Sequence, residues 1–577
     1  MNKIRFRFFS LMGLSLLILA QGCKKDKTDL RQDNRVLTVN RANSNVRIIN
    51  LAGFNQVKAN GDSLTSFVVK NPFTADGLKY PGTSYFPTDG KLGKTWFVPQ
   101  DIFKANETAE FDFGLRTYQA SGMADIKMTA KNDYNNPTDY YLLPTFFMTG
   151  QPAVVPVNRG VSVPSKPDHF KIRIVNLTGS INSPGSNPSG TLENLAGSVS
   201  LAFADGTLVN TATSNVSAAQ RTSDYIEVPY GTYQFRVLSA NGRQLPASGG
   251  DIYDYTIIDP PTSTMPVSLS QNTGLTFAPI QTYQPGGIYT IVVAPQNFKV
   301  IMDELNNSTD SYQNSFQIVN DNSAAANNTY FRIQGANAFD NQPVSFRLDG
   351  KTIATNISFG TSSDYHIQVH GNHLVEAIDA SGKVIASASQ TLRPSQNYTA
   401  WVYADSNGQG KLLLVANDLS GSGYTTAQED ASFSRWQFKF PFYKRFLNLS
   451  VGNPYITFTL NNGQTSSGIN NNPNAGVNMQ PGLPLYEQPY TNSTYNQAAF
   501  DIMAYRSKPN VVPGVWASDI EVLKSDSFIA NKALYTNVSR MLPVQEAGIY
   551  TVALIGATGT NVPVAKKARM MIVKHNK

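Results

Sequence analysis

Short runs in which apolar residues alternate with polar ones recur along the chain and predict β-strands. An inner strand carries such a mixture, and an asparagine near its end favours the exit into a turn. Four of these runs are related in sequence: VRIINL at 46–51, IRIVNL at 172–177, FQIVND at 316–321 and KRFLNL at 444–449. Each run therefore predicts the opening strand of a repeated β unit.

The second and third units share further landmarks at equal spacing. In both, an Asp-Gly pair follows the asparagine of the opening strand by 29 positions, Asp205-Gly206 in one and Asp349-Gly350 in the other. Asp and Gly accept the positive φ that a tight hairpin turn requires. A Ser-Asp-Tyr sequence comes next, at 223–225 and 363–365, and a glycine follows each tyrosine by six positions. The shared spacing indicates duplicated domains.

The domain organisation follows from these repeats. Each unit runs roughly 120–150 residues with a turn signal about every ten, which fits a Greek-key β-sandwich of seven or more strands. The predicted domains are a divergent sandwich at 41–163 and three repeats at 168–305, 312–418 and 432–577. The first is called divergent because its ending at 139–144 resembles the closing strands of the others only distantly. Polar stretches at 164–167, 306–310 and 420–423 are expected to be linkers, and the Asn-rich segment 461–478 is expected to be an insertion.

The first 22 residues have the three parts of a secretion signal. Lys3, Arg5 and Arg7 precede an apolar core at 11–20, which is short for a membrane span of about 20 residues. The sequence Leu-Ala-Gln-Gly before Cys23 looks like a lipobox, so Cys23 is the predicted lipid anchor and 23–40 a flexible tether. We expect a lipoprotein of the outer membrane that faces outward from the cell surface.

Composition and charge narrow the function classes. Hydrophobic residues make up 41% and charged residues 15%, and Cys23 is the one cysteine, so no disulfide forms within the chain. Of the net charge of +7, three positive charges lie in the leader and five in the last twelve residues, which leaves −1 for the rest. A nucleic-acid binder would spread its basic residues over a folded face. Nucleic acid is therefore not an expected partner.

The pattern resembles a repeat-domain family of unknown function that is found in cell-surface lipoproteins of Bacteroidetes. Its members open with an Arg-x-Val-Asn type of strand, carry an Asp-Gly hairpin and a Gly-x-Tyr segment, and end in an apolar strand pair; the resemblance covers roughly residues 166–577. It implies an all-β fold of tandem Ig-like β-sandwich domains. It implies no chemistry, no cofactor and no functional residues.

Three histidines form the best candidate site for chemistry. His366, His370 and His373 lie within eight positions, and imidazoles at such spacing can bind zinc or copper. The corresponding places in the second unit are Ile226, Tyr230 and Tyr233, which are ordinary strand residues. We therefore keep the cluster as a weak candidate beside a plain hairpin, and predict no metal or cofactor.

Catalytic motifs are not evident. Gly93-Lys94-Thr95 resembles the end of a phosphate-binding loop, but Thr88 stands where the first glycine is required. No Gly-x-Ser-x-Gly sequence occurs, and the cysteine is taken by the anchor. Paired carboxylates of a glycoside hydrolase stay possible because such pairs meet only in space. Calcium ligands at 303–310 would match no known loop.

Aromatic residues offer a second way to bind a ligand. Sugars pack their C–H faces on aromatic rings, and an exposed aromatic cluster would indicate such a site. For each tryptophan, packing in a core is the competing explanation, above all for Trp401 inside a predicted closing strand. The four candidates are Trp96, Trp401, Trp436 and Trp516.

The sequence therefore predicts a non-catalytic surface protein whose tandem sandwiches bind or adhere to a glycan, matrix or protein partner. Two alternatives stay open: a structural subunit of a surface assembly or nutrient-uptake complex, and a glycan-active hydrolase. Close carboxylates in a cleft would favour the hydrolase, and exposed edge strands or a large apolar patch would favour the assembly subunit.

Overall fold

The computed structural model describes residues 42–66, 82–88, 90–115, 126–182, 186–187, 190–191, 193–248, 275–276, 279–301, 308–322, 324–339, 342–417, 419, 442–465, 472–486, 489–492, 499–537 and 542–577. The predicted leader, Cys23 and the tether lie outside these residues, as do Trp436 and the stretches 303–304 and 420–423. The chain divides into two compact units. One runs to Phe146 and includes Gln151–Arg159; the other comprises Phe147–Gly150 and Gly160–Lys577.

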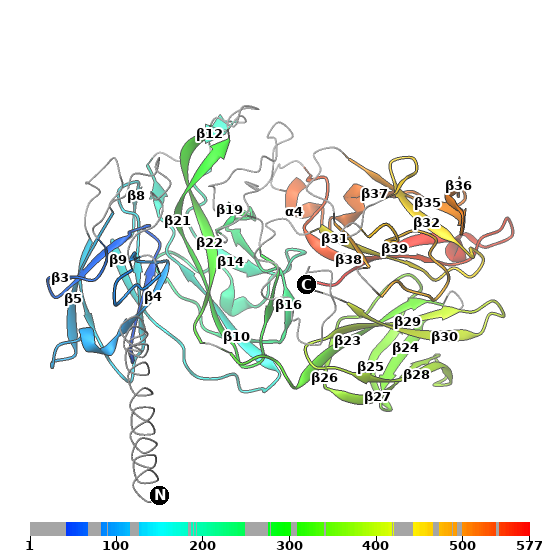
Figure 1. The fold of residues 1–577 in the computed structure, drawn as a ribbon, viewed down its shortest axis with the longest axis horizontal. Coiled ribbons are helices and arrows are strands. Elements are labelled where there is room, and N and C mark those ends of the chain that lie inside the picture. The colour runs from blue at the N-terminus through cyan, green and yellow to red at the C-terminus, as the bar shows by residue number, and fades with distance from the viewer. Residues whose placement is uncertain are drawn as a thin grey trace, which may run out of the picture. The chain divides into compact units, whose positions relative to one another are not determined.

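The fold is all-β and built of several sandwiches, as the alternating pattern predicts: 50% of the described residues lie in strands and 4% in helices (Figure 1). No helix among the described residues has the length and apolar character to cross a membrane. The helical segments are short: η1 (Gln100–Ile102), η2 (Thr211–Thr213), η5 (Ser525–Phe528), α4 (Ala533–Thr536) and η6 (Val564–Lys566).

The first unit is a sandwich of two four-stranded sheets. One sheet has the order β4 (Thr95–Pro99), β1 (Asn43–Asn50), β7 (Thr138–Leu142), β9 (Val154–Asn158). The other has the order β3 (Asp62–Ser63), β2 (Gln56–Ala59), β5 (Thr108–Gly114), β6 (Ile126–Lys131). β1 pairs antiparallel with β4 and parallel with β7, and the core lies between the two sheets.

The second unit repeats this strand order three times. In the first repeat, the order that corresponds to β4-β1-β7-β9 is β15 (Ile226–Pro229), β10 (His169–Asn176), β21 (Ile288–Ile301), β22 (Ser308–Asn320). In the second it is β26 (His366–Val369), β23 (Tyr330–Ala338), β29 (Asn397–Ala404), β30 (Gly410–Asn417). In the third it is β34 (Tyr490–Asn492), β31 (Phe442–Asn448), β38 (Gly548–Ile555), β39 (Arg569–Lys574). In each, the first strand of the sandwich runs parallel to the last but one. We number the resulting sandwiches two, three and four.

The facing sheets complete these sandwiches. Sandwich three has β25 (Lys351–Ile357), β24 (Val344–Leu348), β27 (Gly371–Ile378), β28 (Val384–Leu392), and sandwich four has β33 (Gln464–Thr465), β32 (Ile456–Leu460), β35 (Asp501–Lys508), β36 (Val511–Trp516), with β37 (Leu523–Lys524) on β35. Sandwich two has shorter pairs: β14 (Val199–Ala202) with β17 (Arg236–Ser239), and β16 (Gly231–Tyr233) with β20 (Gln281–Tyr283). The remaining short strands are β8 (Met148–Thr149) with β11 (Ser180–Ile181), β12 (Ser186–Asn187) with β13 (Gly190–Thr191), and β18 (Ala247–Ser248) with β19 (Leu275–Thr276).

A buried asparagine is the last or the last but one residue of the first strand in every described sandwich. Its side-chain amide donates to two backbone carbonyls, and its Oδ1 accepts a backbone N–H two or four residues later, so it satisfies groups that the chain would leave unpaired where it exits the sheet. The four residues are Asn50, Asn176, Asn337 and Asn448. Three of them lie in the opening strands that the sequence predicts.

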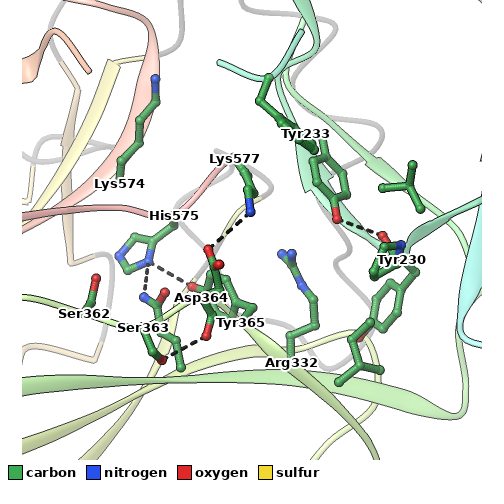
Figure 2. A pocket seen from close by; sticks show the side chains of 15 residues that line it. Tyr230, Tyr233, Arg332, Ser362, Ser363, Asp364, Tyr365, Lys574, His575 and Lys577 are labelled. Atoms are coloured by element: carbon green, nitrogen blue, oxygen red, sulfur yellow. Dashed lines mark hydrogen bonds and ion pairs between the residues drawn. The ribbon is translucent and has the colours of Figure 1, made fainter. Parts of the chain in front are cut away.

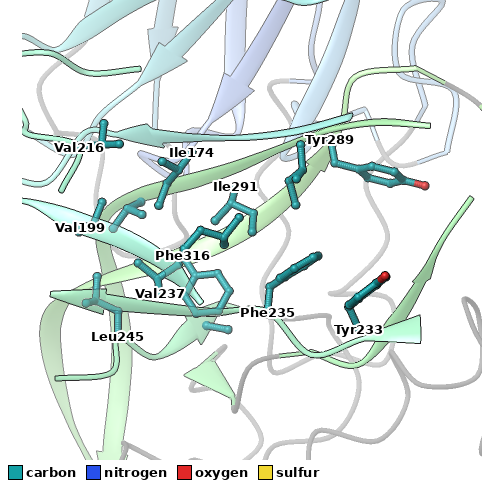
Figure 3. Close-up of a cluster of buried hydrophobic side chains, with 14 of the residues drawn as sticks. Ile174, Val199, Val216, Tyr233, Phe235, Val237, Leu245, Tyr289, Ile291 and Phe316 are labelled. Atoms are coloured by element: carbon teal, nitrogen blue, oxygen red, sulfur yellow. The ribbon is translucent and has the colours of Figure 1, made fainter. Parts of the chain in front are cut away.

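The predicted opening strand of the third repeat is wrong. Residues 316–320 form the end of β22, and Asp321 follows it. β22 pairs with β21 along its whole length and closes sandwich two. Phe316 points into the core of sandwich two, close to Phe235 (Figure 3). Sandwich three opens with β23 instead, so the predicted boundary between 305 and 312 is also wrong, and 308–310 belong to a strand rather than a linker. The equal spacing of 29 positions was a coincidence.

The physical reason is that β22 lies between β21 and β18, inside its sheet like an opening strand, and carries the same apolar pattern. The pattern therefore predicts a strand without predicting its partner. The predicted turn at Asp349-Gly350 is independent of this error and is confirmed: both residues have positive φ, 49° and 78°, between β24 and β25.

Sandwiches three and four pack against each other through their first sheets. The outer faces of these sheets form one buried apolar cluster, which is distinct from the core of either sandwich. Trp401 is fully buried in this cluster. The sequence predicts that it packs in a core, and it packs between two sandwiches instead. The members are Ala336, Ala338, Trp401, Val415, Leu447, Leu449, Ala553, Ile555, Met571 and Val573.

A candidate binding pocket among three sandwiches

A pocket of about 550 Å³ lies in the second unit where sandwiches two, three and four meet (Figure 2). Its volume is within the range of about 300–1,000 Å³ that is usual for small-molecule sites. Sandwich two contributes Phe203, Val228, Pro229, Tyr230 and Tyr233; sandwich three contributes Arg332, Gln334, Ser362, Ser363, Asp364, Tyr365 and Ile367; the end of sandwich four contributes Lys574, His575 and Lys577.

Arg332 on β23 is the central charged group of this pocket. Its side chain is buried, with 4% of the residue exposed, and its Nε donates to Oδ1 of Asn397 at 2.6 Å. The guanidinium carbon lies 4.6 Å from the ring centre of Tyr365 and 5.9 Å from that of Tyr230. Figure 2 shows the guanidinium pointing into the space between these tyrosines. Nη2 has no hydrogen-bond partner, and no described carboxylate forms an ion pair with Arg332.

The other sandwiches show why an arginine at this place is unusual. Each of them carries an arginine three positions before the buried asparagine, and its guanidinium lies over an aromatic ring in or just before the neighbouring strand: Arg47 on Phe97, Arg173 on Tyr225 and Arg445 on Tyr490. Sandwich three has Gln334 at that position, and its amide donates to Thr399. Arg332 lies two residues earlier on the same face of the strand, which places its guanidinium over Tyr365 and in the pocket.

A neutral hydrogen-bond network forms the floor of the pocket. Nδ1 of His575 lies 2.9 Å from the hydroxyl of Tyr365, and Nε2 lies 2.7 Å from Oγ1 of Thr551. Burial, aided by Arg445 and Arg332, lowers the pKa of His575 to about 3, so the ring is neutral at pH 7. Burial raises the pKa of Tyr365 to about 12. Both hydrogen bonds of the His575 ring therefore join neutral groups.

The remaining charges make the pocket positive. Lys577 pairs with Asp364 at 3.4 Å, but both side chains are largely exposed, so water weakens the pair. Lys574 lies 3.5 Å from Glu546, a carboxylate outside the lining residues. The lining thus carries three basic side chains and one acidic one.

A buried ion pair beside the pocket joins sandwiches two and four. Nη2 of Arg236 on β17 lies 3.0 Å from Oε1 of Glu546, and Tyr535 and the Ala530 N–H also donate to this carboxylate. Burial by itself would raise the pKa of Glu546, but Arg236 and Lys574 outweigh it, and the pKa is lowered. The main chain of Lys577 adds hydrogen bonds to Thr232 and Gln234 of sandwich two.

The three histidines predicted as a weak metal site do not come together. His366 lies in β26 and His373 in β27, and these strands belong to opposite sheets of sandwich three, so the chain crosses between sheets beside His370. Both ring nitrogens of His373 are engaged, Nδ1 with Asp349 at 2.7 Å and Nε2 with the Val369 carbonyl at 2.9 Å. No group of three or more potential metal ligands occurs among the described residues.

The tryptophans take different positions. Trp96 is buried in the core of the first unit, 5.9 Å from Phe111 between ring centres. Trp516 on β36 is 47% exposed and can contact a partner. Tyrosines, not tryptophans, line the pocket.

Sequence reasoning missed Arg332 and His575. Tyr365 lies in the Ser-Asp-Tyr repeat, and Lys574 and Lys577 lie in the basic C-terminal segment. The sequence patterns therefore include these residues but assign them no binding role. One sequence signal could have drawn attention to this strand: Gln334 stands where the other opening strands have an arginine. It can be recognised only when β23 is aligned as the opening strand of sandwich three. No family model matches the chain, and no similar curated protein is found.

Proposed function

We propose that this chain is a non-catalytic, lipid-anchored protein of the outer membrane that faces outward and binds a ligand in the pocket among its sandwiches. The observation that carries the proposal is the buried Arg332 guanidinium, which has an unpartnered Nη2 and lies between tyrosine rings in a pocket of ligand size. The resemblance to surface lipoproteins and the predicted anchor at Cys23 support the location.

The titratable groups of the pocket support a binding role over catalysis. General acid–base catalysis works best with a group whose pKa lies near the working pH. His575 has a pKa of about 3 and both of its nitrogens are hydrogen-bonded, while Tyr365 has a pKa of about 12. Hydrolysis of a glycoside usually requires two carboxyl groups, and the pocket lining contains Asp364 alone.

The binding role can be tested by filling the pocket. The full chain, purified in detergent, would be screened on a glycan array beside a Ser362→Trp variant, because Ser362 is an exposed lining residue. We expect the native chain to bind and the variant to lose the signal, with no release of reducing ends from any bound glycan. Binding that survives in Ser362→Trp, no binding by the native chain, or hydrolysis would each contradict the proposal.

The anchor is tested separately by Cys23→Ser. The thiol at this position accepts the diacylglycerol, so its loss should remove the lipid mass from the intact protein and shift it from the membrane fraction to the soluble fraction. A variant at another residue of the tether, Thr28→Ser, serves as the control and should remain in the membrane. A Cys23→Ser protein that still fractionates with the membrane would refute lipid anchoring.

A second candidate function is that of a structural subunit in a surface assembly or uptake complex. β36 is the outermost strand of its sheet, and four of its apolar side chains are exposed: Val511, Val512, Val515 and Trp516. An exposed apolar edge strand is a template for pairing with another chain. Crosslinking on intact cells should then give an adduct that Val515→Lys abolishes and Lys508→Arg retains.

A further inference from the structure

We infer that the pocket binds an acidic sugar, with the carboxylate or sulfate group on Arg332 and the sugar ring against the tyrosines. This inference rests on the proposed binding function and specifies the chemical class of its ligand.

The first step of the argument is the unsatisfied charge of Arg332. A buried ion without a counter-charge is costly, and a guanidinium pairs best with an oxyanion through two parallel N–H donors. Asn397 occupies only Nε, and Nη2 is unpartnered. Space beside Nη1 is kept by Gly231 on β16, where a Cβ would lie 2.3 Å from that nitrogen. The guanidinium is thus held at the pocket wall with a buried Nη2 that no protein group satisfies.

The second step is the sign of the surrounding charge. Lys577 and Asp364 pair with each other and offset one another, and Lys574 pairs with Glu546, so Arg332 leaves the lining with a net positive charge. Glu546 is occupied by Arg236 and Lys574. A concave site with one predominant sign of charge attracts ligands of the opposite sign. An anion is therefore favoured.

The third step separates a sugar from other anions. Tyr230, Tyr233 and Tyr365 place aromatic rings in the lining, and the exposed hydroxyl of Ser362 can bond a hydroxyl group of a sugar. Inorganic sulfate would use the arginine but would leave most of the 550 Å³ empty. The lining combines a guanidinium, aromatic rings and an exposed hydroxyl in one cavity of ligand size.

Calorimetry on the full chain in detergent tests this inference. The probes are trigalacturonic acid, its neutral methyl ester, a galactose disaccharide with one sulfate ester, and the same disaccharide without sulfate. We expect at least one charged sugar to bind about ten-fold or more tightly than its neutral counterpart, and the two pairs distinguish carboxylate from sulfate as the recognised group. Binding should weaken as salt rises.

Arg332→Gln should abolish the preference for the charged sugar. The matched control is Arg173→Gln, which removes an arginine stacked in the same way on Tyr225 but outside the pocket lining, and which should retain the preference. If Arg332→Gln does not fold, Gly231→Ala displaces the guanidinium without removing its charge, and Lys577→Gln removes an exposed charge. Both should lower the affinity for the charged sugar several-fold.

Equal affinity for charged and neutral sugars, or a preference that survives Arg332→Gln, would overturn the inference while leaving the binding function intact. Equally tight binding of inorganic sulfate, or of a tripeptide with a free C-terminal carboxylate, would overturn it as well.

Discussion

Lys444 is fully buried in β31, with its amine 4.0 Å from the centre of the Phe442 ring. Burial lowers the pKa of this amine from 10.5 to about 7. A buried lysine with a lowered pKa costs stability, because the folded state must either hold a poorly solvated charge or release the proton. The residue scale thus offers a direct link between one side chain and the pH dependence of stability.

Lys444→Met should raise the free energy of unfolding by a few kcal/mol at pH 7, from roughly 1.4 kcal/mol for each unit of the pKa difference. Because the folded pKa lies below the unfolded one, the unfolded chain binds the additional proton between about pH 7 and 10.5. The native protein should therefore gain stability as pH rises across that window, and the variant should lose this slope. Urea unfolding from pH 6 to 10 measures both effects.

The control for this prediction is Lys411→Met, because the Lys411 side chain is mostly exposed and pairs only at 3.9 Å with Asp405. Its stability should change little. A Lys444→Met variant that is less stable than the native protein, with the pH slope retained, would show that the lysine is stabilising.

At the scale of elements, each sandwich has a buried asparagine at the end of its first strand, where it hydrogen-bonds backbone groups of the chain that leaves the sheet. In sandwich three this residue is Asn337, which donates to the carbonyls of Gln342 and Ile357 and accepts from the Phe339 N–H. Asn320, the counterpart expected from the sequence, is exposed at the end of β22. The two residues have the same type and similar neighbours in sequence but different places in the fold.

Asn337→Ala should therefore destabilise the protein by about 2–4 kcal/mol, because one buried and two partly buried backbone groups lose a partner. Each unsatisfied group costs about 1–3 kcal/mol, and water and relaxation recover part of this. Asn320→Ala should cost less than about 1 kcal/mol, as surface changes usually do. Denaturant midpoints of the two variants make the comparison. A larger destabilisation by Asn320→Ala than by Asn337→Ala would contradict this assignment and favour β22 as the opening strand of sandwich three.

The all-β class and three of the four buried asparagines at strand ends were predictable from the sequence. Alternation, Asp-Gly turns and an asparagine after a strand each depend only on residues that are neighbours along the chain. β1, β10 and β31 were found from their sequences, and so was the turn at Asp349-Gly350. β23 was missed because its sequence, YFRIQGANA, has small residues where the other opening strands are bulky. Those small residues are explained by the apolar cluster between sandwiches three and four, which includes Ala336 and Ala338.

At the scale of the whole second unit, the sandwiches are joined by buried contacts. Sandwiches three and four share the cluster around Trp401, and sandwiches two and four share the Arg236–Glu546 ion pair. The pocket is enclosed by residues of all three, so its shape depends on these contacts. A change at the ion pair should therefore affect both stability and ligand binding.

Glu546→Gln should lower the free energy of unfolding by about 3–5 kcal/mol, because Arg236 is left buried without its counter-charge. The folded pKa of Glu546 is lowered from 4.5, so the stabilisation is present above that pH and is lost as pH falls through the folded pKa. The native protein should show this acid-dependent loss, and the variant should show less of it. Unfolding curves from pH 2 to 7 measure the difference.

Glu521→Gln is the matched control, since Glu521 is exposed on the same sandwich. It should change neither the stability at pH 7 nor the acid-dependent loss. A Glu546→Gln protein as stable as the native one would mean that the Arg236 charge is satisfied by other groups.

The amino-acid sequence by itself determined the all-β class, the turn at Asp349-Gly350 and the asparagine exits of three opening strands. These features depend on residues that are neighbours along the chain, so a local pattern is sufficient to predict them. The tertiary structure alone decided that β22 closes sandwich two, and that Arg332, Tyr230 and His575 meet in one pocket. The physical reason is that alternation shows which face of a strand is apolar, whereas the partner of that face is chosen by the packing of whole sheets.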